Sequence, residues 1–209
     1  MDVTPSLSLF DNAYQSRTAP WVIGEPQAAI VDLERAGWIR GKVLDVGCGA
    51  GEHTILLTRL GYDVLGIDFA PYAIAQARDN AAAQGVDARF AVVDAMNLGD
   101  EPRYDTIVDS ALFHIFDDTD RPKYVASLHA ACRPDALVHV LALSDAGRGF
   151  GPQVSETDIR EAFDDGWVLE ALDTAKYRGV VGEAHSEVLG LPVGARVDEP
   201  AWLARARRV

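Results

Sequence analysis

A chain of 209 residues has the length of about one domain, and 48% of its residues are hydrophobic, so it can bury a large core. Its formal net charge of −13 at pH 7 argues against a nucleic-acid partner, because phosphate contacts need clustered lysine and arginine. Residues 1–5 carry no basic start and no long apolar run, so we expect no signal peptide and no membrane span.

The cysteines and the basic residues add two further expectations. Cys48 and Cys132 show no metal-ligand spacing, which indicates a reduced, cytoplasmic protein without a bound metal. The one basic cluster, Arg205, Arg207 and Arg208, alternates with alanine near the C-terminus. This alternation predicts the solvated face of an edge strand rather than a binding patch.

Aromatic residues gather ahead of the first predicted strand. Phe10, Tyr14, Pro20 and Trp21 all lie within residues 1–24. This segment fits either an arm that packs over the core or a lid that places Tyr14 and Trp21 against a ligand. Residues 25–36 then predict a helix, which has a proline in its first turn and a glycine after its end.

A glycine loop between a strand and a helix is the central motif of the sequence. Residues 42–46 predict a buried strand, Gly47, Gly49 and Gly51 follow it, and a helix begins at Glu52. Because glycine has no side chain, a ligand can approach this backbone, and the N–H groups of the helix start point toward it. A tight turn without a ligand is the alternative for the glycines alone.

The glycine spacing indicates the kind of cofactor. Dinucleotide-binding folds use G-x-G-x-x-G around a pyrophosphate, whereas this loop reads G-x-G-x-G. Asp45 also precedes the first glycine. A carboxylate there is unfavourable for a pyrophosphate and suits a cofactor that carries an ammonium or a sulfonium group.

The second and third predicted strands both end in an acidic residue. Residues 62–68 end at Asp68, near the position, roughly 20 residues past the loop, where a carboxylate binds ribose hydroxyls. Residues 88–95 end at Asp94 and Ala95, where a carboxylate and an N–H can contact an adenine ring. The alternatives are a helix cap for Asp68 and a turn aspartate for Asp94.

Strands and helices continue to alternate as far as residue 143. Residues 106–109 and 136–143 predict the fourth and fifth strands, and residues 122–132 predict the helix between them. Such alternation implies a parallel sheet covered on both faces, which binds ligands at the carboxyl ends of its strands. The glycine loop, Asp68, Asp94 and Ser110 all lie at such ends.

The last third of the chain is less regular. Residues 155–163 predict a helix, 167–174 a sixth strand and 201–209 a closing strand. Residues 179–200 are glycine-rich and predict an irregular segment, either a long loop over the site or a loose connection. We expect one domain with an N-terminal helical arm or lid (1–40), a cofactor-binding core (41–145) and an acceptor-side region (146–209).

At these residues, from 41 to 143, the chain resembles the class I S-adenosylmethionine-dependent methyltransferases. The resemblance implies an α/β, Rossmann-like, doubly wound seven-stranded sheet that is mostly parallel, with an antiparallel last strand and helices on both faces. It implies that the glycine loop faces the methionine part of S-adenosyl-L-methionine, Asp68 its ribose, and Asp94 with Ala95 its adenine. The expected cofactor-binding residues are Tyr14, Trp21, Asp45, Gly47, Gly49, Gly51, Asp68, Phe69, Asp94, Ala95 and Ser110.

A narrower resemblance concerns the acceptor. Residues 10–14, 20–27 and 109–118 resemble bacterial thiopurine-methyltransferase-like proteins, which include methyltransferases for quinolone-like heterocyclic toxins. The resemblance implies methyl transfer to oxygen, sulfur or nitrogen of a small aromatic or heterocyclic compound, in a detoxification role. Methyltransferases that modify the amino groups of nucleic-acid bases carry an Asn/Asp-Pro-Pro-aromatic motif after the fourth strand. This chain reads Asp109-Ser110-Ala111-Leu112 there, which favours a small-molecule acceptor.

His114 is the candidate catalytic residue, as a general base or as a contact to the acceptor. Its alternative is a histidine that packs or caps the next helix. His53 is expected to support the site indirectly, and His185 reaches an acceptor only if its segment folds inward. Five aromatic residues can line an acceptor pocket or belong to the core: Tyr14, Trp21, Phe113, Phe116 and Phe150.

Two other functions remain open from the sequence. One is a non-catalytic module that binds S-adenosylmethionine. The other is a nicotinamide-dependent oxidoreductase. The glycine spacing and the missing Tyr-x-x-x-Lys pattern both argue against it. The sequence does not decide whether the protein forms a homodimer.

Overall fold

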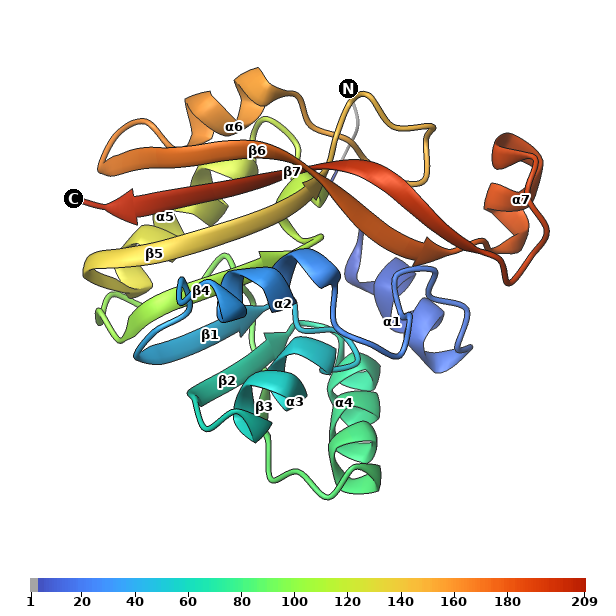
Figure 1. The fold of residues 1–209 in the computed structure, drawn as a ribbon, viewed down its shortest axis with the longest axis horizontal. Helices are drawn as coiled ribbons and strands as arrows, with labels where there is room; N and C mark the ends of the chain where they lie inside the picture. Colours follow the sequence, from blue (N-terminus) through green and yellow to red (C-terminus); the bar gives the residue numbers. More distant parts are fainter. Residues whose placement is uncertain (1–3) are drawn as a thin grey trace.

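A seven-stranded mixed sheet runs through the molecule in the computed structural model, which describes residues 4–209 (Figure 1). The strand order is β3-β2-β1-β4-β5-β7-β6. The strands are β1 (Lys42–Val46), β2 (Asp63–Asp68), β3 (Arg89–Val92), β4 (Tyr104–Ser110), β5 (Cys132–Leu143), β6 (Trp167–Val180) and β7 (Arg196–Arg208).

Five strands are parallel, and the last strand reverses the direction. β1 pairs in parallel with β2 and β4, β2 with β3, and β4 with β5. β7 lies between β5 and β6 and is antiparallel to both. This topology confirms the predicted doubly wound sheet with an antiparallel last strand.

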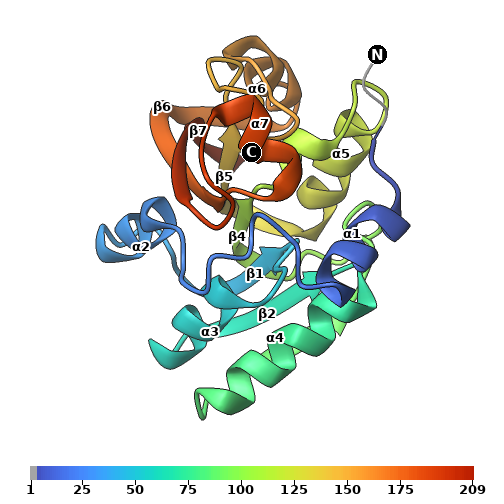
Figure 2. The ribbon, with the colours of Figure 1, turned by 90° about the vertical axis from the view of Figure 1, so that its right-hand side faces the viewer.

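Helices cover both faces of the sheet, as predicted (Figure 2). α5 and α6 pack through Tyr124 and Ile159 on one face, and α2 and α3 pack through Ile30 and Leu57 on the other. The helices are α1 (Leu7–Gln15), α2 (Ala28–Arg35), α3 (Glu52–Arg59), α4 (Pro71–Ala83), the 3-10 helix η1 (Phe113–Ile115), α5 (Arg121–Ala131), α6 (Glu156–Ala162) and α7 (Glu183–Leu189).

Two expectations about the C-terminal region are wrong. Residues 179–200 are not irregular throughout, because they contain the end of β6, the helix α7 and the start of β7. β7 is not an edge strand, since β5 and β6 flank it. The guanidinium groups of Arg205 and Arg207 instead pair with the carboxylate of Glu170 on β6, and Arg205 also stacks 3.6 Å from the ring centroid of Trp38.

The N-terminal arm is held to the rest of the chain by specific polar contacts. The Val180 N–H at the end of β6 donates to the Pro20 carbonyl at 2.7 Å. The buried side chain of Gln27 pairs with the backbone of Arg178, donating to its carbonyl at 2.8 Å and accepting from its N–H at 2.9 Å. These bonds join segments about 150 positions apart and fix the arm over the carboxyl end of the sheet.

Residues 1–3 lie outside the described residues, so the expectation about a signal peptide rests partly on a stretch that the structure does not describe. Within residues 4–209, no helix combines the length and the apolar character needed to cross a bilayer.

Asp109 anchors the turn between β4 and α5. Its carboxylate is fully buried and accepts from the N–H groups of Leu112 and Phe113 at 2.9 and 3.2 Å and from the Tyr124 hydroxyl at 2.7 Å. Burial raises the pKa of Asp109 to about 6. The stability of the turn that contains η1 therefore depends on the hydrogen bonds that these three donors make to the Asp109 carboxylate.

We expect Tyr124→Phe to lower the free energy of unfolding by about 1–3 kcal/mol, because a buried acceptor loses a donor. Urea denaturation followed by circular dichroism measures the change. Tyr72→Phe is the matched control, since Tyr72 is 45% exposed and its hydroxyl bonds only an exposed glutamine. Equal stability of both variants would contradict this account of the turn.

Candidate functional site

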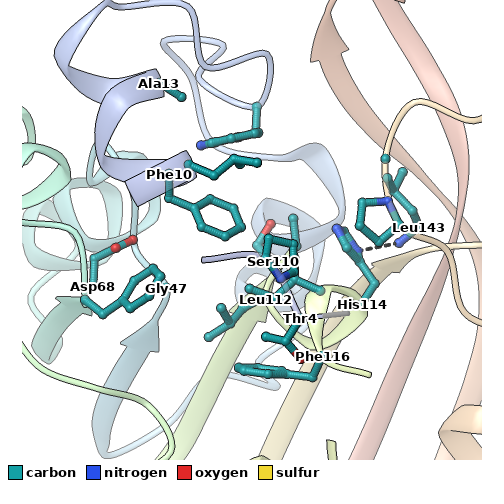
Figure 3. A pocket seen from close by; sticks show the side chains of 18 of the residues that line it. Thr4, Phe10, Ala13, Gly47, Asp68, Ser110, Leu112, His114, Phe116 and Leu143 are labelled. Carbon is teal, nitrogen blue, oxygen red and sulfur yellow. Dashed lines mark hydrogen bonds between the residues drawn. The ribbon is translucent and has the colours of Figure 1, made fainter. Parts of the chain in front are cut away.

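A cavity of about 660 Å³ lies at the carboxyl ends of the parallel strands (Figure 3). One residue at or just beyond the end of each of five strands lines it: Gly47 after β1, Asp68 of β2, Asp94 after β3, Ser110 of β4 and Leu143 of β5. The sequence predicted that such positions meet at one rim, and the structure brings them together there.

The N-terminal arm covers this cavity. Phe10, Ala13 and Tyr14 of α1 line it together with Trp21. The Trp21 indole N–H donates to the Tyr14 hydroxyl at 2.7 Å, and the Phe10 ring packs edge-on against Phe69 with centroids 5.8 Å apart. The arm is therefore both packed and part of the cavity wall, which combines the two alternatives of the sequence analysis.

The glycine loop lies against the arm with little room for side chains. Gly47 and Gly49 have φ angles of 66° and 53°, a region that L side chains rarely adopt. A Cβ at Gly49 would lie 2.6 Å from the Tyr14 hydroxyl oxygen, and one at Gly47 would lie 3.0 Å from the Leu112 side chain. The bare backbone of the loop is thus required by its surroundings.

A smaller cavity adjoins the loop and is lined by an acid with one unpartnered oxygen. Gly47, Gly49, Glu52 and Trp21 line this space of about 40 Å³. The Oε1 atom of Glu52 is buried without a hydrogen-bond partner among the described residues. Burial raises the pKa of Glu52. A bare loop beside an unpaired carboxylate oxygen fits the ammonium group at the amino-acid end of S-adenosylmethionine.

Asp68 links the loop to the next helix. Its Oδ2 accepts from the Gly49 N–H at 3.1 Å, and its Oδ1 accepts from the Ala70 N–H at 2.9 Å. The residue is 8% exposed, and burial raises the pKa of its carboxyl to about 6. Each carboxylate oxygen has a further lone pair, so Asp68 can also accept hydrogen bonds from a ligand in the cavity.

Asp94 both shapes a turn and lines the cavity. Its Oδ1 accepts from the Met96 N–H at 2.9 Å, and its Oδ2 accepts from the Asn97 side-chain amide at 2.9 Å. The neighbouring Ala95 is buried and lines the same cavity. The turn alternative thus describes the local geometry of Asp94, and its position on the cavity leaves a ligand contact open.

Two of the expected cofactor residues lie behind the loop instead of on either cavity. Asp45 is 1% exposed and accepts a 2.5 Å bond from the Thr54 hydroxyl. Burial raises its pKa to about 7. Gly51 starts α3 with a φ of 87°, where a Cβ would lie 2.9 Å from the Phe90 ring. In this structure both residues hold the loop in place.

His114 lies on η1 and lines the cavity. Its Nδ1 accepts a 2.9 Å hydrogen bond from the main-chain N–H of Leu143, the dashed line in Figure 3. The residue is 6% exposed, and burial lowers its pKa to about 3. His114 is therefore a neutral imidazole at physiological pH.

The other two histidines considered from the sequence have different surroundings. His53 lines the smaller cavity, and its Nε2 accepts from the Gln27 N–H at 3.0 Å, which agrees with an indirect role. α7 brings His185 to the large cavity, where its ring stacks on Phe150 with centroids 4.7 Å apart.

Of the five aromatic candidates, four line the cavity, whereas Phe113 is fully buried and packs on Phe163. Sequence analysis missed Leu9, Phe10, Leu112, Leu143, Pro152 and Tyr177 as cavity residues. A signal existed for two of them. Phe10, Ala13 and Tyr14 have helical spacing, and Tyr177 continues the alternation of β6 beyond the predicted end at residue 174.

Comparison with known proteins identifies the family. Residues 43–135 match the family profile described as a methyltransferase domain. The 2-heptyl-1-hydroxyquinolin-4(1H)-one methyltransferase of Mycobacteroides abscessus is 33% identical over 183 residues, which cover 80% of each chain. This chain belongs to the class I S-adenosylmethionine-dependent methyltransferases. Its enzyme class and its cofactor, S-adenosyl-L-methionine, follow from that membership.

Solved structures show the same fold. A protein studied in the conversion of a disulfide bond into a thioacetal group during echinomycin biosynthesis is 38% identical, with a TM-score of 0.86 over 97% of this chain and 92% of that one. The 1,6-didemethyltoxoflavin-N1-methyltransferase of Burkholderia thailandensis is 19% identical, with a TM-score of 0.68 over 97% of this chain and 87% of that one. The second likeness concerns the fold alone.

We expect Asp68→Ala to weaken binding of S-adenosylhomocysteine at least tenfold, because the cavity loses a charged acceptor and the loop loses its bond to β2. A tenfold loss corresponds to about 1.4 kcal/mol. Isothermal titration calorimetry measures it. Asp63→Ala, at the exposed start of the same strand, is the control and should leave the affinity unchanged. Unchanged affinity in Asp68→Ala would contradict the predicted role of Asp68 in binding the cofactor.

The raised pKa of Asp68 also predicts a pH dependence. Its carboxyl has a pKa of about 6, so it is ionised at pH 8 and increasingly protonated at pH 5. Protonation removes an acceptor, so the affinity for S-adenosylhomocysteine should fall as the pH drops through about 6, by up to about tenfold per unit. Titrations at pH 5, 6, 7 and 8 test this, with Asp68→Asn expected to be weak and flat across the range.

Proposed function

We propose that this methyltransferase methylates an oxygen, sulfur or nitrogen atom of a small aromatic or heterocyclic compound, with hydroxyquinolone-like compounds as the acceptor class to test first. The observation that carries the proposal is the apolar wall of the cavity beyond the cofactor loop. That wall consists of Leu9, Leu112, Ile115, Phe116, Phe150 and Pro152. The name of the Mycobacteroides abscessus relative supports a hydroxyquinolone acceptor.

We assign the cofactor to the polar side of the same cavity and to the smaller cavity that adjoins the glycine loop. Gly47, Gly49 and Glu52 would hold its methionine part, Asp68 its ribose, and Asp94 with Ala95 its adenine. Bound there, S-adenosylmethionine supplies an electrophilic methyl group on a sulfonium. The chain's own contribution is to align the acceptor atom and to exclude water, and alignment of this kind can contribute about 7 kcal/mol or more.

The walls of the cavity suit a flat acceptor. Phe116 packs against the buried ring of Tyr124 with centroids 4.5 Å apart, and Phe150 stacks on His185, which also lines the cavity, so both rings are held by a neighbouring ring. Fixed aromatic faces bind planar rings through dispersion and apolar burial. The net charge of −13 disfavours a nucleic-acid acceptor, because a strongly acidic protein repels phosphates.

The remaining alternatives are weaker. A nicotinamide-dependent oxidoreductase does not agree with the family. A module that only binds the cofactor has no use for a second, apolar compartment of this size. Inactivation of heterocyclic toxins in the cytoplasm is the corresponding proposal for the physiological role.

We expect methyl transfer to a panel of small planar acceptors. The purified protein is incubated with S-[methyl-³H]adenosylmethionine and with hydroxyquinolones, phenols, aromatic thiols and azaheterocycles, and the methylated products are identified by mass spectrometry. Transfer to at least one planar acceptor, and none to an aliphatic alcohol or an oligonucleotide, is the expected result. Binding of the cofactor without transfer to any of these compounds would contradict the proposal.

We also expect Phe150→Ala to raise the KM for a planar acceptor about tenfold, because one wall of its compartment is lost, while the affinity for S-adenosylhomocysteine stays unchanged. Tenfold corresponds to about 1.4 kcal/mol, within the range for a lost aromatic contact. Steady-state kinetics and calorimetry measure the two quantities. Leu60→Ala is the control, because Leu60 is 50% exposed at the end of α3. An unchanged KM would place the acceptor elsewhere.

A further inference from the structure

One hydrogen bond fixes the tautomer of His114. Its Nδ1 lies 2.9 Å from the main-chain nitrogen of Leu143, and an amide nitrogen can only donate. Nδ1 must therefore carry a lone pair, and the single proton of the neutral ring resides on Nε2. Leu143 is a strand residue at the end of β5 and pairs with Ala201 of β7, so its N–H is held in position.

The ring has no means of becoming charged at physiological pH. His114 is 6% exposed and lies between apolar neighbours on η1, and burial alone lowers its pKa to about 3. No carboxylate contacts its ring among the described residues. The ionisable groups that share the cavity with it are Tyr14, Asp68, Asp94, Tyr177 and His185.

The Nε2–H group is free for a ligand. Within residues 4–209, the bond to Leu143 is the only hydrogen bond of the His114 side chain, and the ring forms part of the cavity wall. A nitrogen that already bears a proton has no lone pair to accept another. In this tautomer His114 cannot act as a general base toward the cavity, and it can donate one hydrogen bond into it.

Resting on the proposed function, we propose that His114 donates its Nε2–H to a negatively charged oxygen of the acceptor, and that the enzyme therefore selects acidic hydroxy- or N-hydroxy-heteroarenes that enter already ionised. His114 is thus a substrate-binding group that favours an acceptor with a negatively charged oxygen. A neutral amine or an ordinary phenol presents no such oxygen.

The reaction then needs no proton acceptor in the protein. The acceptor loses its proton to solvent before it binds; its oxygen lone pair forms the new O–C bond while the C–S bond breaks and its electron pair remains on sulfur. A phenol with a pKa near 10 is ionised to only about one part in a thousand at pH 7, whereas a heteroarene with a pKa near 6 is about 90% ionised. Because His114 can only donate toward the cavity, it favours the ionised heteroarene.

The tautomer can be measured without turnover. The ¹⁵N shifts of His114, assigned by comparison with His114→Gln, should show a protonated Nε2 and an unprotonated Nδ1 that do not change between pH 6 and 8. A proton on Nδ1, or titration of the ring within this range, would overturn the proposal. This readout is independent of the proposed function, because it needs neither cofactor nor acceptor.

Two variants separate the donor from the ring. In the presence of S-adenosylhomocysteine, His114→Gln keeps an N–H donor and should bind an acidic hydroxyquinolone within a few fold of the wild-type affinity. His114→Phe keeps an aromatic ring without a donor and should bind it about 10–100-fold more weakly, as expected for a lost charge-assisted bond. Equal losses in both variants would overturn the donor role. S-adenosylhomocysteine affinity is the folding control and should stay unchanged in both.

The pH profile distinguishes the donor from a base. Across acceptors whose own pKa values differ by several units, the midpoint of kcat/KM against pH should follow the pKa of each acceptor. A midpoint that stays the same for all acceptors would reveal an ionising group of the enzyme and overturn the proposal. Failure of the wild-type protein to methylate any planar acceptor would instead count against the proposed function.

Discussion

The carboxylate of Asp68 holds the polar side of the cavity together. It accepts from the Gly49 N–H of the loop after β1 and from the Ala70 N–H at the start of α4, so one side chain sets the relative position of two strand ends. Burying a carboxylate is costly, and these main-chain bonds offset that cost. The pKa of Asp68, raised to about 6, shows that these bonds do not offset the whole cost of burial. Because the bonds form within the protein, the floor of the cavity exists before any ligand binds.

The cavity divides into two chemically different parts. Its polar part comes from the parallel strands, whose carboxyl ends present Gly47, Asp68 and Asp94. Its apolar part is closed by segments distant in sequence, including Phe10 of α1 and Tyr177 of β6. In Figure 1 the end of β6, the helix α7 and the start of β7 extend past the sheet on the same side as α1. The proposed sites for the cofactor and for the acceptor therefore meet at the boundary between these two parts.

His114 shows how far a local pattern can be interpreted. Its place after the fourth strand indicated a residue near the acceptor, and the structure puts it on the cavity wall. Its hydrogen-bond partner, Leu143, is 29 positions away, so no local pattern could show which ring nitrogen is free. The prediction that the basic cluster lies on an edge strand was wrong for a similar reason. The alternation of Arg205 and Arg207 correctly indicated a strand, but their partner Glu170 belongs to β6, which packs beside β7 only in the folded chain.

The sequence by itself determined the five parallel strands, the bare loop and the acidic residues that follow the strands. These features depend on hydrophobic periodicity and on missing side chains, which are local properties. Parallel strands bring their carboxyl ends to one edge, so the shared rim could be deduced as well. Only the tertiary structure decided that β7 lies between β5 and β6 and that α1 and α7 cover the cavity. It also decided that Asp45 and Gly51 lie behind the loop, and which nitrogen of His114 carries the proton. Each of these depends on contacts between groups that the chain brings together only when it folds.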